Sequence, residues 1–457
     1  MNLERIKESI FREYDIRGIW NDEITVNGAY TLGRSFGSYI DKMGDNNFIV
    51  GYDNRVSSPI IHDALIKGLM ESGANVIDLG LVTTPMYYYA KLIYKITSGV
   101  MITASHNPKE YNGFKFSFST AGNACGQEIY DFRDFTNSLN FIEKQGSVKT
   151  LDIRPEYLPD VKRSIEFGHR RPKVVIDCGN GTGSIIIHDM MKMFDCDYDL
   201  LYCESDPNFP NHHPDPSVAK NMVDLGNRVK ELGYDFGIGI DGDGDRVGIV
   251  DENGNMILND LMMIIVWRHL SPVLKKRKAI YDVKCSKSLI DELENLGIEH
   301  EMYRTGNSYM NLKIHQSGVD FSGEYSGHIW FLDKWHGTDD GIYGGLRLIE
   351  LVSKTDKKVS ELLEGINKYY STEEIKIHTP DEIKFEVVDK IKEYCTSKGY
   401  KMITVDGVRV CFDDSWALVR CSNTGPNITI RFEAKTEERL AEINKEFTDV
   451  LNLYMNI

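Results

Sequence analysis

The chain has 457 residues, of which 41% are hydrophobic and 27% charged, with a formal net charge of −16. This composition is typical of a soluble protein of several domains, and the negative charge argues against nucleic acid or an acidic membrane as the main partner. No apolar run is long enough to cross a bilayer, and the first residues lack the apolar core of a signal peptide. The eight cysteines form no C-x-x-C pair, which predicts reduced thiols in the cytoplasm.

The first three quarters of the chain alternate strand-like and helix-like segments. A strand is expected at 47–53, a helix at 60–74 and the next strand at 75–79. The same order begins again with strands at 172–177 and 278–283. Repetition of strand, loop and helix predicts α/β units that resemble one another and are built on parallel strands.

The last quarter has a different pattern. Residues 374–378 and 416–420 read as strands of an antiparallel sheet, and helices are expected at 381–398 and 437–454. This pattern predicts a smaller α+β domain. The domains are expected to pack around a shared site, with limits at 1–152, 153–255, 256–368 and 369–457.

A serine loop follows an apolar segment at 99–102 and reads Thr103-Ala104-Ser105-His106-Asn107-Pro108. A buried strand would therefore deliver the Ser105 hydroxyl to a loop whose small residues leave it accessible. Such a serine can act as a nucleophile or phosphate carrier when a metal or a base assists it. His106 taken alone is more often a turn residue, because adjacent residues rarely form a catalytic dyad.

An aspartate loop, Asp241-Gly242-Asp243-Gly244-Asp245-Arg246, lies between strand-like segments at 235–240 and 247–250. Carboxylates this close repel one another unless a cation lies among them, and hard oxygen ligands suit Mg²⁺ or Ca²⁺. The spacing of acids, with Glu252 last, imitates an EF-hand. That loop needs glycine where Arg246 stands, and it needs helices at both ends. A solvated acidic turn is the other alternative, which the regular alternation with glycine disfavours.

Two later loops carry groups that could hold a sugar phosphate. The segment 323–328, Gly-Glu-Tyr-Ser-Gly-His, reads alone as a polar turn, but its carboxylate and hydroxyl could bind vicinal sugar hydroxyls. The segment 420–427 combines Arg420 with hydroxyl and amide donors, and Arg431 follows shortly after. These groups suit a phosphate, although a surface hairpin turn is the alternative.

The serine and aspartate loops together resemble those of the α-D-phosphohexomutase family. The segment 11–18, Phe-Arg-Glu-Tyr-Asp-Ile-Arg-Gly, is similar to the start of its phosphomannomutase/phosphoglucomutase branch. The resemblance extends over essentially the whole chain. It implies an α/β fold in which three similar α/β domains with mixed sheets and a C-terminal α+β domain surround a central cleft. In chain order the domains would carry the phosphoserine, metal, sugar and phosphate-binding loops.

The resemblance also implies roles for individual residues. Residues expected at the reacting phosphate, among them the candidate general bases, are Arg17, Ser105, His106 and Lys115. The expected ligands of Mg²⁺ are Asp241, Asp243, Asp245 and an oxygen of phosphorylated Ser105, with Arg246 as a further active-site residue. Residues expected to bind the substrate are Tyr14, Lys284, Glu324, Ser326, His328, Arg420, Ser422, Asn423, Thr424 and Arg431. Asn307 departs from the family pattern, in which histidine is common at that position.

The expected activity is the interconversion of hexose 1-phosphate and hexose 6-phosphate through a hexose 1,6-bisphosphate. The segment 11–18 favours mannose or glucose, because the glucosamine branches usually begin with Phe-Gly-Thr-Asp-Gly. Phosphoglucosamine mutase, a sugar-phosphate phosphatase and a sugar-phosphate binding protein without catalysis are the alternatives. The expected partners are sugar phosphates, and the protein is expected to be a monomer or a small homo-oligomer.

Overall fold

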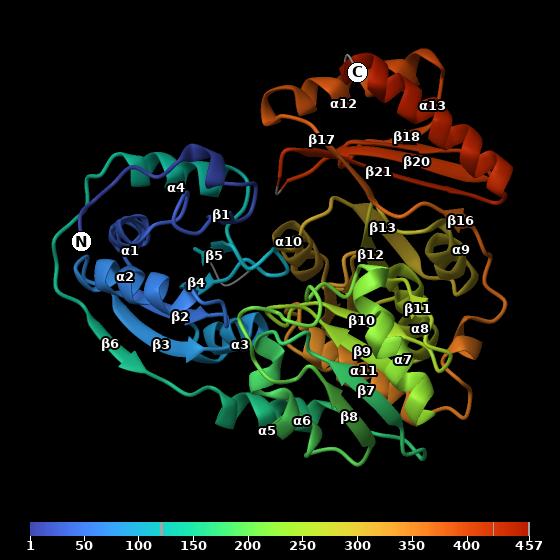
Figure 1. Cartoon of the computed structure of the whole chain (residues 1–457), viewed down its shortest axis with the longest axis horizontal. Helices are drawn as coiled ribbons and strands as arrows, with labels where there is room; N and C mark the ends of the chain where they lie inside the picture. Colours follow the sequence, from blue (N-terminus) through green and yellow to red (C-terminus); the bar gives the residue numbers. More distant parts are fainter. Residues whose placement is uncertain (119–121, 424, 456–457) are drawn as a thin grey trace.

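The computed structural model describes residues 1–118, 122–423 and 425–455. Four sheets follow one another along the chain, and each forms the centre of one domain. Figure 1 shows the first domain in blue at the left, the second and third in green and brown at the lower right, and the last in red at the top. None of the helices in these described ranges has the length and apolar content needed to cross a bilayer.

The first domain has a mixed sheet. Its strands in spatial order are β1 (Ile16–Ile19), β5 (Tyr111–Ser117), β4 (Ser98–Ile102), β2 (Asn47–Tyr52), β3 (Asn75–Leu81) and β6 (Ser147–Thr150). β2 is parallel to β3 and β4, whereas β5 is antiparallel to β1 and β4. Its helices are η1 (Glu8–Ile10), α1 (Val26–Asp41), α2 (Ser58–Met70), α3 (Thr84–Tyr94) and α4 (Gln127–Asn137). The predicted order of strand, helix and strand is confirmed, but α2 ends early, ahead of Gly73 with its positive φ of 83°.

The second domain follows α5 (Arg154–Ser164). Its strands in spatial order are β11 (Met256–Ile257), β10 (Val247–Val250), β9 (Phe236–Ile240), β7 (Lys173–Asp177) and β8 (Asp197–Leu201). Its helices are η2 (Thr182–Ile185), α6 (Ile187–Met191), η3 (Ala219–Met222) and α7 (Val223–Leu232). β7 is parallel to β8 and β9, whereas β10 is antiparallel to β9. Because strands flank the aspartate loop on both sides, the EF-hand alternative is excluded.

The third domain repeats this design with fewer strands. Its strands in spatial order are β13 (Glu299–Tyr303), β12 (Lys278–Asp282), β14 (Phe321–Gly323) and β15 (Ile329–Phe331). Its helices are α8 (Asn259–Leu270), α9 (Lys287–Asn295), α10 (Asn307–Ser317), α11 (Gly341–Ser353) and η4 (Ser360–Leu363). β12 is parallel to β13 and β14, and β15 is antiparallel to β14. The repeated α/β design with mixed sheets is confirmed: in each of the three sheets the parallel strands extend to one edge (β6, β8 or β13), and antiparallel strands form the other.

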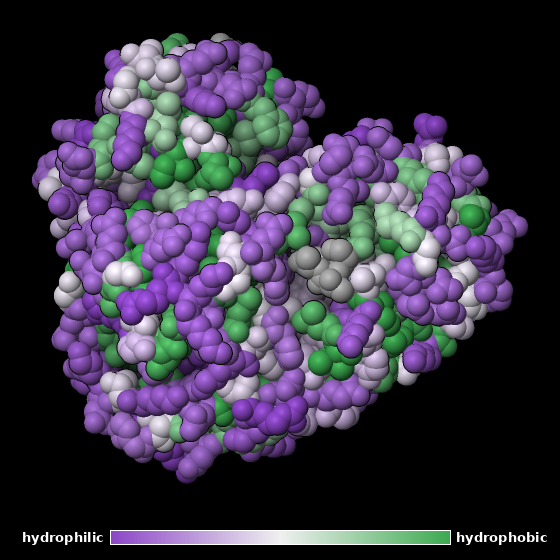
Figure 2. Space-filling model, turned by 180° about the vertical axis from the view of Figure 1, so that it is seen from behind, coloured by the Kyte–Doolittle hydropathy of each residue, from purple (hydrophilic) through white to green (hydrophobic). Residues whose placement is uncertain are grey.

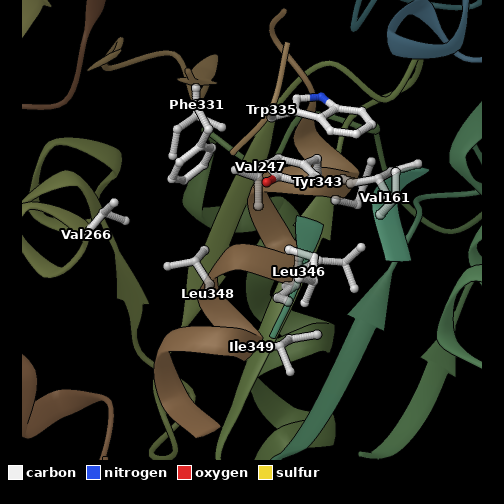
Figure 3. Close-up of a cluster of buried hydrophobic side chains, with 14 of the residues drawn as sticks. Val161, Val247, Val266, Phe331, Trp335, Tyr343, Leu346, Leu348 and Ile349 are labelled. Carbon is white, nitrogen blue, oxygen red and sulfur yellow. The ribbon is translucent and has the colours of Figure 1, made fainter. Parts of the chain in front are cut away.

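The first three domains share one apolar core. Buried side chains of α3, β7, β9, β10, α8 and α11 belong to a single cluster. Figure 3 shows Tyr343, Leu346 and Ile349 of α11 within this core, facing Val161 of α5 and Val247 of β10. Shared burial of this kind fixes the second and third domains against each other.

The fourth domain is an antiparallel sheet covered by two helices on its outer face (Figure 1), which confirms the predicted α+β type. Its strands are β16 (Tyr370–Ser371), β17 (Ile375–His378), β18 (Met402–Ile403), β19 (Val408–Cys411), β20 (Ser415–Cys421) and β21 (Asn427–Ala434). Its helices are α12 (Asp381–Ser397) and α13 (Glu437–Met455). They pack on a separate core that no residue of the other domains joins in the described part of the chain. Figure 2, seen from behind, shows this domain as a lobe with a mostly hydrophilic surface.

Candidate functional site

A cavity of about 300 Å³ lies where the four domains meet. The predicted site residues in its wall are Tyr14, Arg17, Ser105, His106, Lys115, Arg246, Lys284, Glu324, Ser326, His328, Arg420, Ser422 and Asn423. Every domain contributes to this wall, so the fold brings together loops that are hundreds of residues apart in sequence. Predicted Thr424 lies outside the described residues.

The serine loop leaves the end of the fully buried strand β4 in a strained conformation. Ser105 has a φ of 50°, in the left-handed region that is uncommon for residues other than glycine. Its backbone amide donates to Thr103 Oγ1 over 2.8 Å, and Arg55 Nη2 donates to its carbonyl over 2.9 Å. Its hydroxyl donates to Asp241 Oδ2 over 3.1 Å. A Cβ on Gly242 would lie 2.6 Å from the Ser105 carbonyl oxygen, so glycine is required for the aspartate loop to approach this closely.

The three carboxylates of the aspartate loop are completely buried together. Asp241, Asp243 and Asp245 are each 0% exposed, and their ligand oxygens lie within 4.8 Å of one another. Oδ1 of Asp243 and Oδ1 of Asp245 accept no hydrogen bond within the described residues, although His328 Nε2 lies 3.3 Å from the latter. Burial and the other two carboxylates raise the pKa of Asp241 well above its usual range. Oxygen donors that are buried, mutually repelling and unpartnered fit a hard divalent cation.

Lys115 supplies positive charge to the same loop from β5. Its Nζ lies 2.9 Å from Asp243 Oδ2 and 2.6 Å from Asp245 Oδ2. Burial would lower the pKa of this ammonium, but the two carboxylates raise it well above its usual range. Lys115 is therefore a protonated side chain. Arg246 Nε lies 3.9 Å from Asp241 Oδ2 and 3.9 Å from Asp245 Oδ1.

Beside Ser105, His106 is paired with a carboxylate from the second domain. Its Nδ1 lies 2.6 Å from Asp215 Oδ2, and Ser217 donates its backbone and side-chain hydrogens to the other oxygen. Burial and the guanidinium of Arg246 lower the pKa of His106 to about 4, although Asp215 acts in the opposite direction. The imidazole is therefore neutral, with Nδ1–H donating to the carboxylate. Nearby, Arg17 Nη2 lies 2.6 Å from Asp15 Oδ2.

The sugar loop, residues 323–328, contacts the aspartate loop through His328. Glu324 Oε2 accepts from Ser326 Oγ over 3.2 Å and lies 3.1 Å from His328 Nδ1, while its Oε1 accepts from the Gly306 amide over 2.7 Å. His328 Nε2 lies 3.3 Å from Asp245 Oδ1. Burial and a neighbouring arginine lower the pKa of His328, but Asp245 and Glu324 raise it more, to about 9. The loop therefore presents a fixed carboxylate and hydroxyl to the cavity.

The fourth domain presents cationic and amide groups to the cavity. Arg420 Nε donates to Asp406 Oδ2 over 2.8 Å, whereas Nη2 of Arg420 is buried with no partner among the described residues. Asn423 donates to the carbonyl of Thr305 over 3.3 Å. From the third domain, Lys284 Nζ lies 3.0 Å from Glu374 Oε2. A fixed guanidinium with an unused donor suits a phosphate oxygen.

Arg431, in contrast to its prediction as a substrate-binding residue, does not reach the cavity wall in the described structure. It is 0% exposed and its Nη1 lies 3.3 Å from Asp260 Oδ2. The same nitrogen donates to the carbonyl of Lys284, and the guanidinium lies 3.9 Å from the ring centroid of Tyr325. Arg431 therefore packs behind the wall, where it supports two residues that do face the cavity.

The carboxylates at or near the cavity that were not predicted from the sequence include Asp215, Glu374 and Asp406. Asp406 precedes a glycine with a positive φ of 70°, and Asp215 stands between two prolines close to the aspartate loop. Such turn positions are the only local signal that these residues carry. Glu374 has no comparable signal, because it precedes an ordinary strand, β17.

Comparison with models of protein families matches the chain in four successive segments. Residues 8–136, 155–254 and 259–369 match alpha/beta/alpha domains I, II and III of phosphoglucomutase/phosphomannomutase, and residues 374–450 match the C-terminal domain. The matches follow the order of the four sheets and together span most of the chain.

Individual relatives agree with this match. A phosphomannomutase/phosphoglucomutase of Pseudomonas syringae is 38% identical over 445 residues, which covers 97% of this chain and 95% of the relative. A phosphoglucomutase of Neisseria gonorrhoeae is 36% identical over 457 residues, with 98% of each chain covered. A crystal structure of a phosphoglucomutase/phosphomannomutase family protein from Burkholderia thailandensis superposes with a TM-score of 0.90, at 33% identity and 98% coverage of both chains.

Proposed function

We propose, because the chain belongs to the phosphoglucomutase/phosphomannomutase family, that it interconverts hexose 1-phosphate and hexose 6-phosphate, with mannose or glucose as the sugar. One observation carries this proposal. A single cavity joins a strained serine, which lies against three buried carboxylates, to a distant arginine with an unused donor. Such a site has a place for a reacting phosphate and a separate place for a second one.

Phosphoryl transfer would begin from phosphorylated Ser105. The bond between phosphorus and Ser105 Oγ breaks as a bond to the free hydroxyl of the substrate forms, which gives a hexose 1,6-bisphosphate. This intermediate turns around in the cavity, and its other phosphate returns to Ser105. The turn exchanges the two ends of the sugar phosphate, so the wall that holds the non-reacting phosphate must accept either end.

The residues that would hold Mg²⁺ are Asp241, Asp243, Asp245 and an oxygen of phosphorylated Ser105. When bound, the cation neutralises charge on the transferred phosphoryl group. Lys115 pairs with Asp243 and Asp245, Arg246 lies near Asp241 and Asp245, and Arg17 is held by Asp15 and Asn107. Buried, fixed charges of this kind need no reorganisation during transfer.

His106 is the candidate that we favour as the general base. Arg17 is a guanidinium and Lys115 is held protonated by two carboxylates, so neither has a lone pair to accept a proton. The ring of His106 is oriented by Asp215, and its Nε2 has no hydrogen-bond partner among the described residues. A general base must accept the proton that the attacking sugar hydroxyl loses.

The sugar would be read by Glu324, Ser326 and His328, and its non-reacting phosphate by Lys284, Arg420, Ser422, Asn423 and Thr424, with Tyr14 beside them. Arg431 would support this group from behind the wall. We further propose hexose 1,6-bisphosphate as the activator that phosphorylates Ser105, a cytoplasmic location, and a monomer or small homo-oligomer. We also propose the domain limits 1–152, 153–255, 256–368 and 369–457.

One assay tests the activity against its alternatives. The protein is incubated with Mg²⁺, a trace of glucose 1,6-bisphosphate, and mannose, glucose or glucosamine 1-phosphate, and the 6-phosphates and free phosphate are measured. We expect 6-phosphates from mannose and glucose with no release of free phosphate. Free phosphate as the main product would identify a phosphatase, and turnover of glucosamine 1-phosphate alone would identify the other branch.

A further inference from the structure

Glu374 places a carboxylate among the cationic groups that face the cavity. Its side chain is 22% exposed and lies between β16 and β17, at the start of the fourth domain. Its Oε2 lies 3.0 Å from Nζ of Lys284, whose side chain is only 7% exposed. A negative charge in a wall that binds phosphate weakens binding, because like charges repel. The carboxylate of Glu374 is therefore unexpected at this position.

The surrounding charges keep this carboxylate ionised. Burial would raise the pKa of Glu374, but Lys284, Lys376 and Arg420 lower it to about 2. The partner ammonium of Lys284 has one further carboxylate nearby, Asp282, at 3.9 Å. Glu374 and Lys284 therefore form an ion pair, and Glu374 lies nearer to the ammonium than Asp282 does.

We propose that Glu374 is a counter-charge that occupies Lys284 in the empty cleft and limits how tightly the wall holds a phosphate group. This inference rests on the proposed function, in which Lys284 and Arg420 bind the non-reacting phosphate. When phosphate binds, the Lys284 ammonium exchanges its ion pair with Glu374 for one with the phosphate. When the phosphate leaves, the pair with Glu374 forms again. Glu374 is thus a positioning residue that acts through Lys284.

The proposed reaction explains why a lower affinity of the cavity wall for the non-reacting phosphate is useful. The bisphosphate must release the non-reacting phosphate, turn and bind again within one cycle, so a wall that holds phosphate too strongly slows turnover. Tight binding of a state that must be left lowers the rate, as in any enzyme limited by release. The pair also joins the third domain to the first strands of the fourth, so it forms and breaks where these two domains meet.

The test compares Glu374→Gln with the wild-type protein. Dissociation constants for inorganic phosphate are measured by calorimetry, and kcat and KM for glucose 1-phosphate are measured with Mg²⁺ and activator. Removing one charge at this distance in a partly buried site predicts phosphate binding about fivefold to tenfold tighter. KM should fall and kcat should fall several-fold.

Two further variants show that the effect passes through the ion pair. Glu373→Gln removes the same charge from the adjacent exposed residue, which also lines the cavity but forms no ion pair in the described structure, and its effect on phosphate binding should be smaller. In a Lys284→Met background, Glu374→Gln should no longer tighten phosphate binding to the same degree, because the partner is gone.

Unchanged or weaker phosphate binding in Glu374→Gln overturns the inference, and so does tighter binding with unchanged kcat. Loss of hexose phosphate turnover in the wild type would instead contradict the proposed function, since phosphate binding is measured without turnover. If Glu374→Gln fails to fold, a crystal structure of the wild type with bound phosphate tests the inference instead. We expect Lys284 Nζ to contact phosphate and to lie more than about 4 Å from Glu374, beyond ion-pair distance; phosphate bound beside an intact pair overturns the inference.

Discussion

The contact between the second and third domains differs in kind from the contact between the third and fourth. The former is part of a continuous apolar core in which α11 packs between β10 and α8. The latter contains a small separate cluster, with Val283 against Trp416 and Leu418, and a set of polar contacts that includes the Lys284–Glu374 pair. Large apolar contacts fix domains, whereas small polar ones permit relative motion.

This difference separates two tasks. The serine, aspartate and sugar loops lie on the three domains that share a core, so the groups proposed to transfer phosphate and to bind the sugar should keep a fixed geometry. The loop proposed to hold the non-reacting phosphate lies on the fourth domain, whose small polar contact with the third would allow it to move as the intermediate turns. Substitutions in the first group should therefore affect mainly kcat, and loss of a phosphate-binding cation in the second should mainly raise KM.

Ser105→Ala should have the largest effect. It removes the atom that carries the phosphate, so we expect kcat to fall by at least about a thousandfold, as when a nucleophile is deleted elsewhere. The measurement is the formation of glucose 6-phosphate with glucose 1,6-bisphosphate supplied. Turnover at the wild-type rate would remove Ser105 from the mechanism.

Asp243→Asn should reduce activity by about a hundredfold, on the order of the loss of one strong electrostatic contact at the reacting centre. The variant replaces a charged oxygen of the aspartate loop with a neutral one of the same size. The Mg²⁺ concentration needed for half-maximal activity should rise as well. An unchanged Mg²⁺ titration would show that Asp243 does not hold the cation.

Leu346→Ala tests the shared core, and Leu418→Ala is its matched control in the small interdomain cluster. Leu346 is 1% exposed in α11 (Figure 3), and its truncation should cost about 2–5 kcal/mol of unfolding free energy. Calorimetry should show the main transition at a lower temperature. Leu418→Ala should affect mainly the fourth domain, seen as faster proteolysis in the segment 364–369 between η4 and β16. Equal shifts of the main transition in both variants would show that the small cluster stabilises the protein as much as the shared core does.

Arg420→Ala should have the smallest effect on chemistry. Because the guanidinium is proposed to bind the non-reacting phosphate, we expect KM to rise by roughly tenfold, or about 1.4 kcal/mol, with a much smaller change in kcat. Steady-state kinetics with glucose 1-phosphate measure both. A loss confined to kcat would place Arg420 at the reacting phosphate instead.

Much of this arrangement can be predicted from the sequence because its signals are local. The apolar run of β4 ends at Ser105, and β9 and β10 bracket the aspartate loop, so both loops are recognisable from strand pattern alone. The strand pattern alone predicts parallel units and does not give the direction of the antiparallel strands β5, β10 and β15, because that direction depends on the turn before each strand. Mixed sheets are expected only from the family resemblance.

What could not be predicted depends on how the domains pack. Thr429 and Arg431 share one face of β21, yet Thr429 faces the cavity whereas Arg431 is covered by the third domain. The pairs His106–Asp215 and Lys284–Glu374 likewise join residues about a hundred positions apart. A strand pattern gives the face on which a side chain lies, but it does not give what covers that face.

The central claim is that Ser105 carries the phosphate that is exchanged with the sugar. The protein is incubated with Mg²⁺ and glucose 1,6-bisphosphate, and the phosphorylated position is mapped by peptide mass spectrometry before and after a chase with unlabelled glucose 1-phosphate. With isotopically labelled phosphate in the bisphosphate, we predict label on Ser105 that the chase transfers to bisphosphate and glucose 6-phosphate. Label that appears on another residue, or that leaves Ser105 only as free phosphate, would contradict the account.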